Sequence, residues 1–354
     1  MMKKIMLLDD SALMRRVVSD IMLKAKDFSI VFQASNGLEG LAYLENNTVD
    51  LIILDMHMPK MNGVEFLRVL KENNVFVPTV IISGVSKRDT KDTLEALELG
   101  ALDFMRKPEN ILRDKVEFEA QLMKMIGAVF HEKKTGIQVT TTPDHRDPIK
   151  RAEKAIARPG AARIGGKGKL VALACSTGGP KALQEMIPML DARINAPIVV
   201  VQHMPAGFTG SLAQRINAQS AITVTEAVDG EMVERGHVYL AKGGNHLILD
   251  DRIIKLTDTP PVGGLRPYAN HMYESLIDSK YEEIICVVLT GMGADGTEGI
   301  RKLKARKRVY VIAQDAQTST IYGMPRAVAE AGLVDEVRPL SEIAEAIKRQ
   351  TGVY

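Results

Sequence analysis

Residues 170–180 read LVALACSTGGP, and this stretch decides the fold of the second half of the chain. Its first six residues form a continuous apolar run, which is typical of a strand buried on both faces of a parallel sheet. Gly178 and Gly179 allow a tight turn, and Pro180 suits the first turn of a helix. The stretch therefore predicts one strand–turn–helix unit of an α/β fold, with Ser176 at the carboxyl end of the strand.

Two further apolar runs end in the same way. Residues 198–202 are followed by His203, and residues 284–290 are followed by a glycine-rich turn and Asp295. Because ligands bind outside the carboxyl ends of the strands in open α/β sheets, we expect Ser176, His203 and Asp295 to lie at one rim. A serine, a histidine and a carboxylate are the inventory of a serine hydrolase. Their chain order differs from that of the α/β-hydrolases and the best-known serine proteases, which disfavours those folds.

Each of these three residues also has a simpler interpretation when it is considered alone. Ser176 could cap a helix, His203 could be structural, and Asp295 could form a turn. Their shared position after three aligned strands favours the joint interpretation. Further strands are expected in this half, and the candidates are residues 237–241, 246–249 and 309–314.

Length and composition limit which classes of protein this chain can belong to. A chain of 354 residues is too long for one ordinary core, so we expect two domains. The net charge of +2 gives no whole-chain argument for nucleic-acid binding, and the two cysteines lie in predicted strands rather than in a disulfide framework. No apolar run approaches the roughly 20 residues of a membrane span, and the apolar start ends at Asp9, too early for a signal peptide. We expect a cytoplasmic protein without membrane insertion.

The first half, residues 1–126, alternates apolar strands with amphipathic helices and predicts a doubly wound parallel sheet. Strand candidates are 4–8, 29–34, 51–54, 79–83 and 103–105, and helix candidates are 11–24, 37–46, 63–73, 91–99 and 112–130. Residues 127–168 are basic, carry prolines and lose the apolar period at about residue 131, which indicates a flexible linker. A plain tether is favoured there over a binding element. The second domain then covers residues 169–354.

Polar residues also gather at the strand ends of the first half. Asp9 and Asp10 end the first strand, Asp55 ends the third, Ser83 ends the fourth and Lys107 follows the fifth. Clustered carboxylates repel one another unless a cation joins them, and an oxygen-only set suits Mg²⁺ with a phosphate. Asp55 could accept a phosphoryl group, with Lys107 and Ser83 binding its oxygens.

This half resembles the receiver domain of two-component response regulators. The resemblance rests on Asp9-Asp10-Ser11, Asp55 with Met58-Pro59 and Gly63, Ser83-Gly84, Gly100-Ala101, and Phe104 before Lys107-Pro108. It implies phosphorylation at Asp55 and Mg²⁺ held by Asp10, Asp55 and the carbonyl of His57. The His57 side chain is expected to be a lone surface histidine.

The second half resembles the catalytic domain of the chemotaxis protein-glutamate methylesterases. The motifs are Ser176-Thr177-Gly178-Gly179, Gln202-His203-Met204-Pro205 with Gly207-Phe208-Thr209, Leu289-Thr290-Gly291-Met292-Gly293, and Ala313-Gln314-Asp315 with Tyr322-Gly323-Met324-Pro325-Arg326. The resemblance implies that Ser176 is the nucleophile, His203 the general base and Asp295 the residue that orients His203. The glycine-rich turn would let the backbone N–H of Met292 stabilise the oxyanion.

The same resemblance implies a Rossmann-like α/β/α hydrolase beside a flavodoxin-like receiver. The implied reaction is hydrolysis of glutamate methyl esters, and deamidation of specific glutamines, on methyl-accepting chemotaxis receptors for sensory adaptation. It implies no cofactor for ester hydrolysis and a chemotaxis histidine kinase as the phosphodonor. Two other classes stay open, which are a non-enzymatic response regulator with a binding output domain and a serine esterase for small molecules. No helix-turn-helix pattern supports a nucleic-acid partner.

Two segments depart from the family's usual pattern. Lys242 precedes Gly243-Gly244-Asn245-His246 where the family often has Ala-Pro-Gly, and Leu265-Arg266-Pro267-Tyr268 stands where it often has His-Arg-Pro-Ser. We expect these departures to affect the substrate groove and not the reaction. Cys175 is expected to be a plain strand residue, and His246 and His271 to be structural.

Overall fold

The computed structural model describes residues 2–131 and 168–353. The chain divides into two compact units, residues 1–134 and 135–354, each of which has its own sheet. Helix α5 continues to His131, so the first residues of the expected linker belong to that helix. The rest of the expected linker, residues 132–167, lies outside the described residues.

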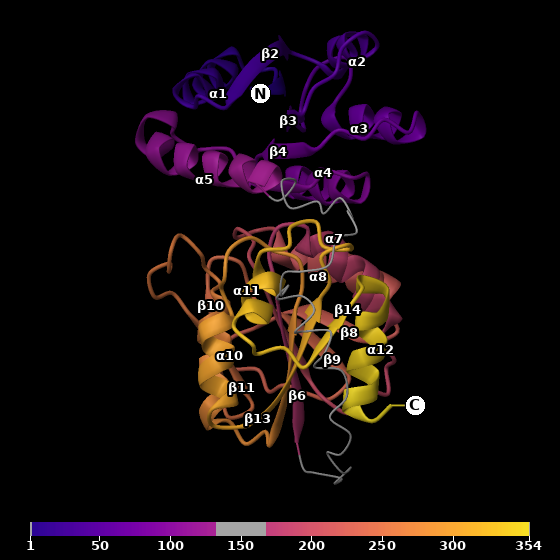
Figure 1. Ribbon diagram of the computed structural model, residues 1–354, viewed down its shortest axis with the longest axis vertical. Helices are drawn as coiled ribbons and strands as arrows, with labels where there is room; N and C mark the ends of the chain where they lie inside the picture. The colour runs from indigo at the N-terminus through magenta and orange to yellow at the C-terminus, as the bar shows by residue number, and fades with distance from the viewer. Residues whose placement is uncertain (1, 132–167, 354) are drawn as a thin grey trace, which may run out of the picture. The chain divides into compact units, whose positions relative to one another are not determined.

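The first unit is a parallel sheet with the strand order β2-β1-β3-β4-β5. Its helices α1 to α5 are labelled in Figure 1. Its strands are β1 (Lys3–Leu8), β2 (Phe28–Ala34), β3 (Leu51–Asp55), β4 (Thr79–Ser83) and β5 (Asp103–Arg106). Its helices are α1 (Ala12–Lys24), α2 (Gly37–Leu44), α3 (Gly63–Glu72), α4 (Lys87–Glu98) and α5 (Ile111–His131). This is the flavodoxin-like order, as predicted.

Alternation along the buried strands separates the two faces of this sheet. Ile5 and Leu7 of β1 face the core that α1 and α5 cover, together with Ile53 of β3 and Val80 of β4. The other face packs against α2 and α3, since a side chain at Gly40 would meet Leu8. Strands buried on both sides have continuous apolar runs, which located β1, β3 and β4, whereas the partly exposed β2 and β5 carry shorter apolar stretches that were still found.

Local hydrogen bonds set where the helices begin. Ser11 caps α1 by accepting a hydrogen bond from Met14 N–H, at 3.3 Å. Helix α4 begins at Lys87, four residues before the predicted start at residue 91. The reason is a capping box, in which Ser86 Oγ accepts from Asp89 N–H while Asp89 Oδ2 accepts from Ser86 N–H. The polar first turn hid this start from the apolar pattern.

The second unit is a seven-stranded parallel sheet with the order β14-β13-β12-β6-β7-β9-β8. Its strands are β6 (Lys169–Cys175), β7 (Ile198–Gln202), β8 (Thr223–Glu226), β9 (His237–Leu240), β12 (Glu283–Val288), β13 (Arg308–Gln314) and β14 (Glu336–Arg338). The helices are α7 (Gly179–Met186), α8 (Thr209–Gln219), α9 (Ala269–Ser275), α10 (Thr297–Lys304), α11 (Met324–Glu330) and α12 (Leu340–Thr351), with short 3₁₀ turns η2 (Ile187–Met189) and η3 (Leu276–Asp278).

The expected strand at residues 246–249 does not join this sheet. It is β10 (His246–Asp250), which pairs antiparallel with β11 (Ile253–Thr257) as a separate hairpin. The short strands β8, β11 and β14 were not predicted, because runs of three to five residues that include polar side chains carry a weak pattern.

Two layers of helices cover the large sheet. Leu170, Ala172 and Ala174 of β6 face a core that includes Tyr273 of α9 and Ile300 of α10. Helix α7 contacts both α8 and α12, and in Figure 1 helix α12 lies on the side of the sheet opposite α10. The predicted class, two doubly wound α/β domains, is confirmed. No helix among the described residues is long and apolar enough to cross a membrane.

Candidate active site

The three strands that carry the candidate triad are neighbours in the second sheet. Strand β6 lies between β7 and β12, so the chain order reverses at β6, and a crevice is expected at its carboxyl end. Ser176 directly follows β6, His203 directly follows β7, and Asp295 follows the turn after β12. Sheet pairing continues one residue past the strands, because His203 N–H donates to Cys175 O at 3.1 Å and Ser176 N–H donates to Thr290 O at 3.0 Å.

His203 and Asp295 form a buried pair. The Nε2 atom of His203 lies 2.7 Å from Oδ2 of Asp295, and the two side chains are 5% and 4% exposed. The other ring nitrogen, Nδ1, is buried and has no hydrogen-bond partner among the described residues. With Nε2–H donating to the carboxylate, Nδ1 carries the lone pair that can accept a proton.

The start of α9 fixes the Asp295 carboxylate. Ala269 N–H donates to Oδ2 at 2.6 Å, and Asn270 N–H donates to Oδ1 at 3.0 Å. Together with the His203 ring, three donors determine how this carboxylate is turned. Sequence reasoning did not find Ala269 or Asn270, because they act through the backbone and no side-chain pattern marks them.

The glycine-rich turn after β12 packs against the serine. A side chain at Gly291 would lie 2.8 Å from the Cβ atom of Ser176, so only glycine allows this approach. Gly291 O accepts hydrogen bonds from the backbone of Gly323 and Met324, at 3.0 and 2.7 Å. No residue of the described ranges accepts a hydrogen bond from Met292 N–H. The turn thus holds an available N–H group close to Ser176.

Buried amides and a hydroxyl reinforce this rim. The side chain of Thr290 donates to Thr177 O at 2.9 Å and accepts from Ile321 N–H at 3.0 Å. Thr290 N–H in turn donates to Oε1 of Gln314 at 2.8 Å. Thr177, Thr290 and Gln314 lie within the motifs that the sequence analysis named, but these hydrogen bonds could not be predicted from the motifs.

Cys175, beside the serine, is the last residue of β6 and is fully buried. Burial raises the pKa of its thiol, so the sulfur stays protonated. Its Sγ–H donates to Oε1 of Gln202 at 3.0 Å. A protonated, enclosed thiol is a poor nucleophile.

The remaining histidines of the second unit contact each other. The rings of His246 and His271 lie 4.6 Å apart, and His246 Nε2 is 3.3 Å from Pro260 O. Burial lowers the pKa of His246. Neither ring has a hydrogen bond to the triad within the part of the chain that the structure describes.

The two segments that depart from the family pattern adjoin each other. Gly244 N–H donates to Arg266 O at 3.1 Å, and Gly243 N–H donates to Thr209 Oγ1 at 2.9 Å. The segment 265–268 leads directly into Ala269, whose N–H binds Asp295. These departures are therefore nearer to the triad than the sequence suggested.

In the first unit, four of the five predicted pocket residues come together between β1, β3 and β5. Carboxylate oxygens of Asp9, Asp10 and Asp55 lie within 4.8 Å of one another. Lys107 Nζ lies 3.1 Å from Asp9 Oδ2 and 2.6 Å from Asp55 Oδ2. A set of three carboxylates beside one ammonium keeps an excess of negative charge, which fits a divalent cation bound through oxygen.

Burial changes the acidity of this pocket. It raises the pKa of Asp9, although the nearby Lys107 opposes the shift. Burial and the negative charge of Asp9 together raise the pKa of Asp55 to about 6, against the lowering effect of Lys107. In the absence of a cation, Asp55 is therefore held ionised at neutral pH at a cost.

Ser83, the fifth predicted residue, ends β4 at the same edge. Its hydroxyl accepts a hydrogen bond from Thr93 Oγ1 of α4 at 2.8 Å, and its carbonyl accepts from Lys107 N–H at 2.8 Å. The side chain is thus engaged with α4.

His57 is a surface side chain, 38% exposed, but the expectation that it stands alone is wrong. The Nε2 atom of His57 hydrogen-bonds to Asp89 Oδ1, and its Nδ1 lies 4.0 Å from Asp92 Oδ2. Both partners belong to α4, whose early start places Asp89 in its first turn. The sequence could not show this contact, because it joins residues 32 positions apart. The turn after Asp55 is consequently tied to α4.

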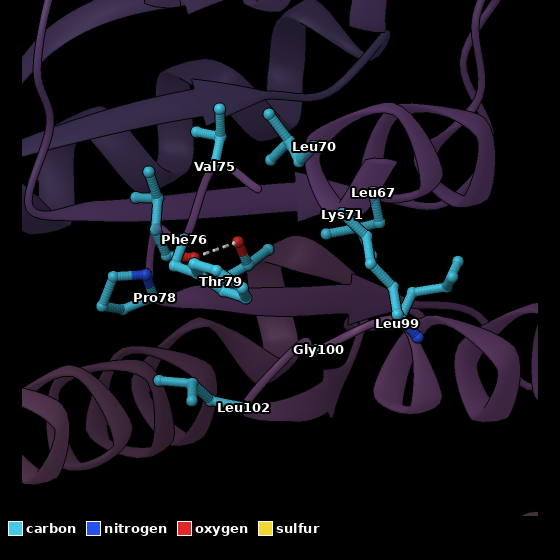
Figure 2. Close-up of a pocket in the computed structure, with 11 residues that line it drawn as sticks. Leu67, Leu70, Lys71, Val75, Phe76, Pro78, Thr79, Leu99, Gly100 and Leu102 are labelled. Carbon is cyan, nitrogen blue, oxygen red and sulfur yellow. Dashed lines mark hydrogen bonds between the residues drawn. The ribbon is translucent and has the colours of Figure 1, made fainter. Parts of the chain in front are cut away.

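The first unit also has an apolar pocket that is unrelated to the acidic one. Figure 2 shows that Leu70, Val75, Phe76 and Leu102 line it. Thr79, at the start of β4, contributes to its wall, whereas Ser83 ends the same strand. The pocket therefore lies at the opposite end of β4 from the acidic residues.

Comparisons with known proteins agree with this geometry. Residues 171–347 match the CheB methylesterase family, and residues 5–117 match the response regulator receiver domain. The protein-glutamate methylesterase/protein-glutamine glutaminase of Geobacillus kaustophilus is 38% identical over 355 residues, covering 99% of both chains. The Bacillus subtilis protein with the same name is 36% identical over 360 residues, covering 98% of both. The crystal structure of the Thermotoga maritima CheB methylesterase catalytic domain is 42% identical, with a TM-score of 0.50, covering 52% of this chain and 100% of that one.

The raised pKa of Asp55 predicts that Asp55→Asn stabilises the protein at neutral pH without metal. The folded state holds a proton on Asp55 up to about pH 6, whereas the unfolded chain loses it near 3.8, so stability falls as the pH rises through that window. One pKa unit corresponds to about 1.4 kcal/mol, so we expect a gain on the order of 3 kcal/mol at pH 7 that vanishes below the unfolded pKa. Lys107 keeps Asp9 as its partner in the variant.

Calorimetric unfolding of the full chain in chelator measures this difference. Asp27→Asn, which changes an exposed aspartate of the same unit, serves as the control and should shift stability by less than about 0.5 kcal/mol. An Asp55→Asn variant that is less stable than the parent at neutral pH would contradict the prediction.

Proposed function

Because this chain belongs to the CheB methylesterase family and carries a response regulator receiver domain, we propose that it is a phosphorylation-regulated protein-glutamate methylesterase and protein-glutamine glutaminase. Its substrates would be methyl-accepting chemotaxis receptors, and its role sensory adaptation. The observation that carries the proposal is the buried His203–Asp295 pair at the strand-order reversal that also places Ser176. In this proposal residues 1–126 are the receiver, 127–168 the linker and 169–354 the catalytic domain.

Ser176 acts as the nucleophile in the proposed reaction. Its oxygen attacks the carbonyl carbon of the γ-methyl glutamyl ester while its proton passes to Nδ1 of His203, the unpartnered ring nitrogen. Asp295 accepts the hydrogen bond from Nε2 and stabilises the imidazolium that forms. The available N–H of Met292 stabilises the negative charge on the carbonyl oxygen.

Collapse of this intermediate gives a glutamyl-enzyme. His203 returns the proton to the leaving oxygen, and methanol departs. A water molecule then attacks the acyl carbon, loses a proton to His203, and releases the glutamate side chain and the free Ser176 hydroxyl. With a glutamine side chain the same steps release ammonia. Apart from this water molecule, every step uses side chains and backbone groups of the protein.

The receiver would be phosphorylated on Asp55 by a chemotaxis histidine kinase. Asp10, Asp55 and the carbonyl of His57 would hold Mg²⁺, whose charge offsets that of the phosphoryl oxygens. Lys107, which already lies 2.6 Å from Asp55, and Ser83 would bind those oxygens. Asp9 completes the acidic set. Both the kinase and the cytoplasmic portions of the receptors imply a cytoplasmic location.

We expect Ser176→Ala to lose methanol release from methylated receptor membranes by roughly 10⁴–10⁶-fold, since the nucleophilic oxygen is absent. Ser279→Ala is the matched control, because Ser279 is a buried serine of the same domain whose hydroxyl donates to Leu276 O and accepts a long hydrogen bond, 3.4 Å, from Lys307 Nζ. Methanol release that survives in Ser176→Ala would refute the proposed mechanism. Turnover of small esters with no release from receptors would instead indicate a small-molecule esterase.

Asp295→Asn should reduce turnover by about 10⁴-fold, as in other triads, with little change in substrate binding. Both carboxylate oxygens of Asp295 accept hydrogen bonds, so an amide nitrogen must face one of three donors. Methanol release at saturating receptor measures the effect, with Asp229→Asn, an exposed aspartate of the same domain, as the control. A variant as fast as the parent would show that Asp295 is only a turn residue.

The proposed phosphorylation of Asp55 can be tested directly. A small phosphodonor with Mg²⁺ should label the chain and raise methanol release, whereas Asp55→Asn should show neither response, because the accepting carboxylate is gone. Asp27→Asn should behave as the parent. Labelling that persists in excess chelator or in Asp55→Asn would exclude the acidic pocket as the phosphorylation site.

A further inference from the structure

We propose that Gln202 is a positioning residue that fixes Ser176 and His203 relative to each other through its carboxamide, and that the Cys175 thiol orients this carboxamide. This inference rests on the proposed function, because it assumes that Ser176 and His203 react together. It concerns a residue pair that the triad mechanism itself does not use.

The Gln202 amide bridges the backbones of the two reacting residues. Its Nε2 group donates one hydrogen bond to Ser176 O at 3.0 Å and another to His203 O at 2.9 Å. The side chain is 1% exposed, so water does not compete for these carbonyls. One planar group thus joins the first residue after β6 to the first residue after β7.

This bridge lies just past the point where backbone pairing between β6 and β7 ends. Cys175 and Gln202 are the last paired residues of β6 and β7, and the hydrogen bond from His203 N–H to Cys175 O is the final rung. Beyond that point the segments after β6 and β7 continue as two separate loops. The Gln202 amide supplies two further hydrogen bonds across the gap, which limits how far the loops move apart.

Helix α7 encloses the amide from the other side. A side chain at Gly179 would lie 1.9 Å from Oε1 of Gln202, so the first turn of the helix packs directly on it. Gly179 N–H also donates to Ser176 O at 2.7 Å. The Ser176 carbonyl is therefore held by two donors, one from its own loop and one from the neighbouring strand.

The Cys175 thiol determines which way the amide is turned. Its Sγ–H donates to Oε1 at 3.0 Å, so the oxygen faces the sulfur and the NH₂ group faces the two carbonyls. The thiol is enclosed and protonated, and it remains a donor at neutral pH. A reversed amide would point its oxygen at two carbonyl oxygens and leave the thiol only the more distant Val201 O, at 3.9 Å, as an acceptor.

Gln202→Glu tests the bridge, because it keeps the shape and replaces the donating NH₂ group by an oxygen. A misplacement of about 1 Å between reacting groups costs on the order of 10²-fold in rate, so we expect kcat for methanol release to fall by about that factor with KM nearly unchanged. A protonated carboxyl regains one donor. The ratio of variant to parent kcat should therefore rise as the pH falls.

Gln184→Glu is the matched control. Gln184 is also a buried glutamine of this domain, 8% exposed, but its Nε2 donates only to Pro180 O at 3.3 Å within α7. The same substitution there introduces a buried carboxylate without touching the bridge. We expect lower thermal stability with a parental kcat and pH profile.

A second pair of variants examines the orienting thiol. Cys175→Ser keeps a donor for Oε1 and should retain most of the parental kcat, whereas Cys175→Ala removes it and should lower kcat by about tenfold, corresponding to one lost hydrogen bond of about 1.4 kcal/mol. If Gln202→Glu does not fold, the comparison of Cys175→Ser with Cys175→Ala still tests whether the orientation of the Gln202 amide affects kcat.

The outcomes separate this inference from the proposed function. A kcat for Gln202→Glu equal to the parent at every pH, or equal losses in Gln202→Glu and Gln184→Glu, would overturn the positioning role while an inactive Ser176→Ala left the esterase mechanism intact. Equal kcat values for Cys175→Ala and the parent would overturn the orienting role. Methanol release by Ser176→Ala would instead refute the proposed function itself.

Discussion

The reversal of strand order is the constraint on which both sites depend. In the first sheet β1 lies between β2 and β3, and in the second β6 lies between β7 and β12. Connections leave such a central strand toward opposite sides, so the loops at its carboxyl end diverge and leave room for side chains. The Asp9–Asp55–Lys107 cluster occupies this place in one unit, and the His203–Asp295 pair with Ser176 occupies it in the other.

The two sites hold their buried carboxylates by different means, and this difference suits their proposed tasks. Asp295 is surrounded by donors without a full positive charge, namely two backbone N–H groups and a histidine ring. Its negative charge therefore remains available to stabilise an imidazolium. Asp55 instead shares one ammonium with Asp9, which leaves the pocket with excess negative charge and raises the pKa of Asp55 to about 6. Such a pocket favours a cation before it accepts a phosphoryl group.

Sequence patterns located the strands better than the contacts between loops. Apolar runs marked all five strands of the first sheet, most clearly the fully buried β3 and β4, and the polar residues at the strand ends identified both candidate sites. The bond between His57 and Asp89, the hold of α9 on Asp295 and the Gln202 bridge could not be predicted. Each depends on how loops far apart in the chain fold onto one another, and two of the three act through backbone groups that every residue type possesses.

The hydrogen bonds from the start of α9 to Asp295 also connect the two segments that depart from the family pattern to the candidate triad. Arg266 donates to the carbonyls of Asp258 and Thr259, and its own carbonyl accepts from Gly244 N–H, so the loops around residues 242–245 and 258–268 form one connected unit. That unit ends at Ala269, whose N–H lies 2.6 Å from the carboxylate of Asp295. A substitution at Lys242 or Leu265 thus acts on a segment whose end orients the Asp295 carboxylate. Variation in these loops therefore reaches the His203–Asp295 pair through the backbone, because the same stretch that holds residues 242–245 also ends at the N–H groups that bind Asp295.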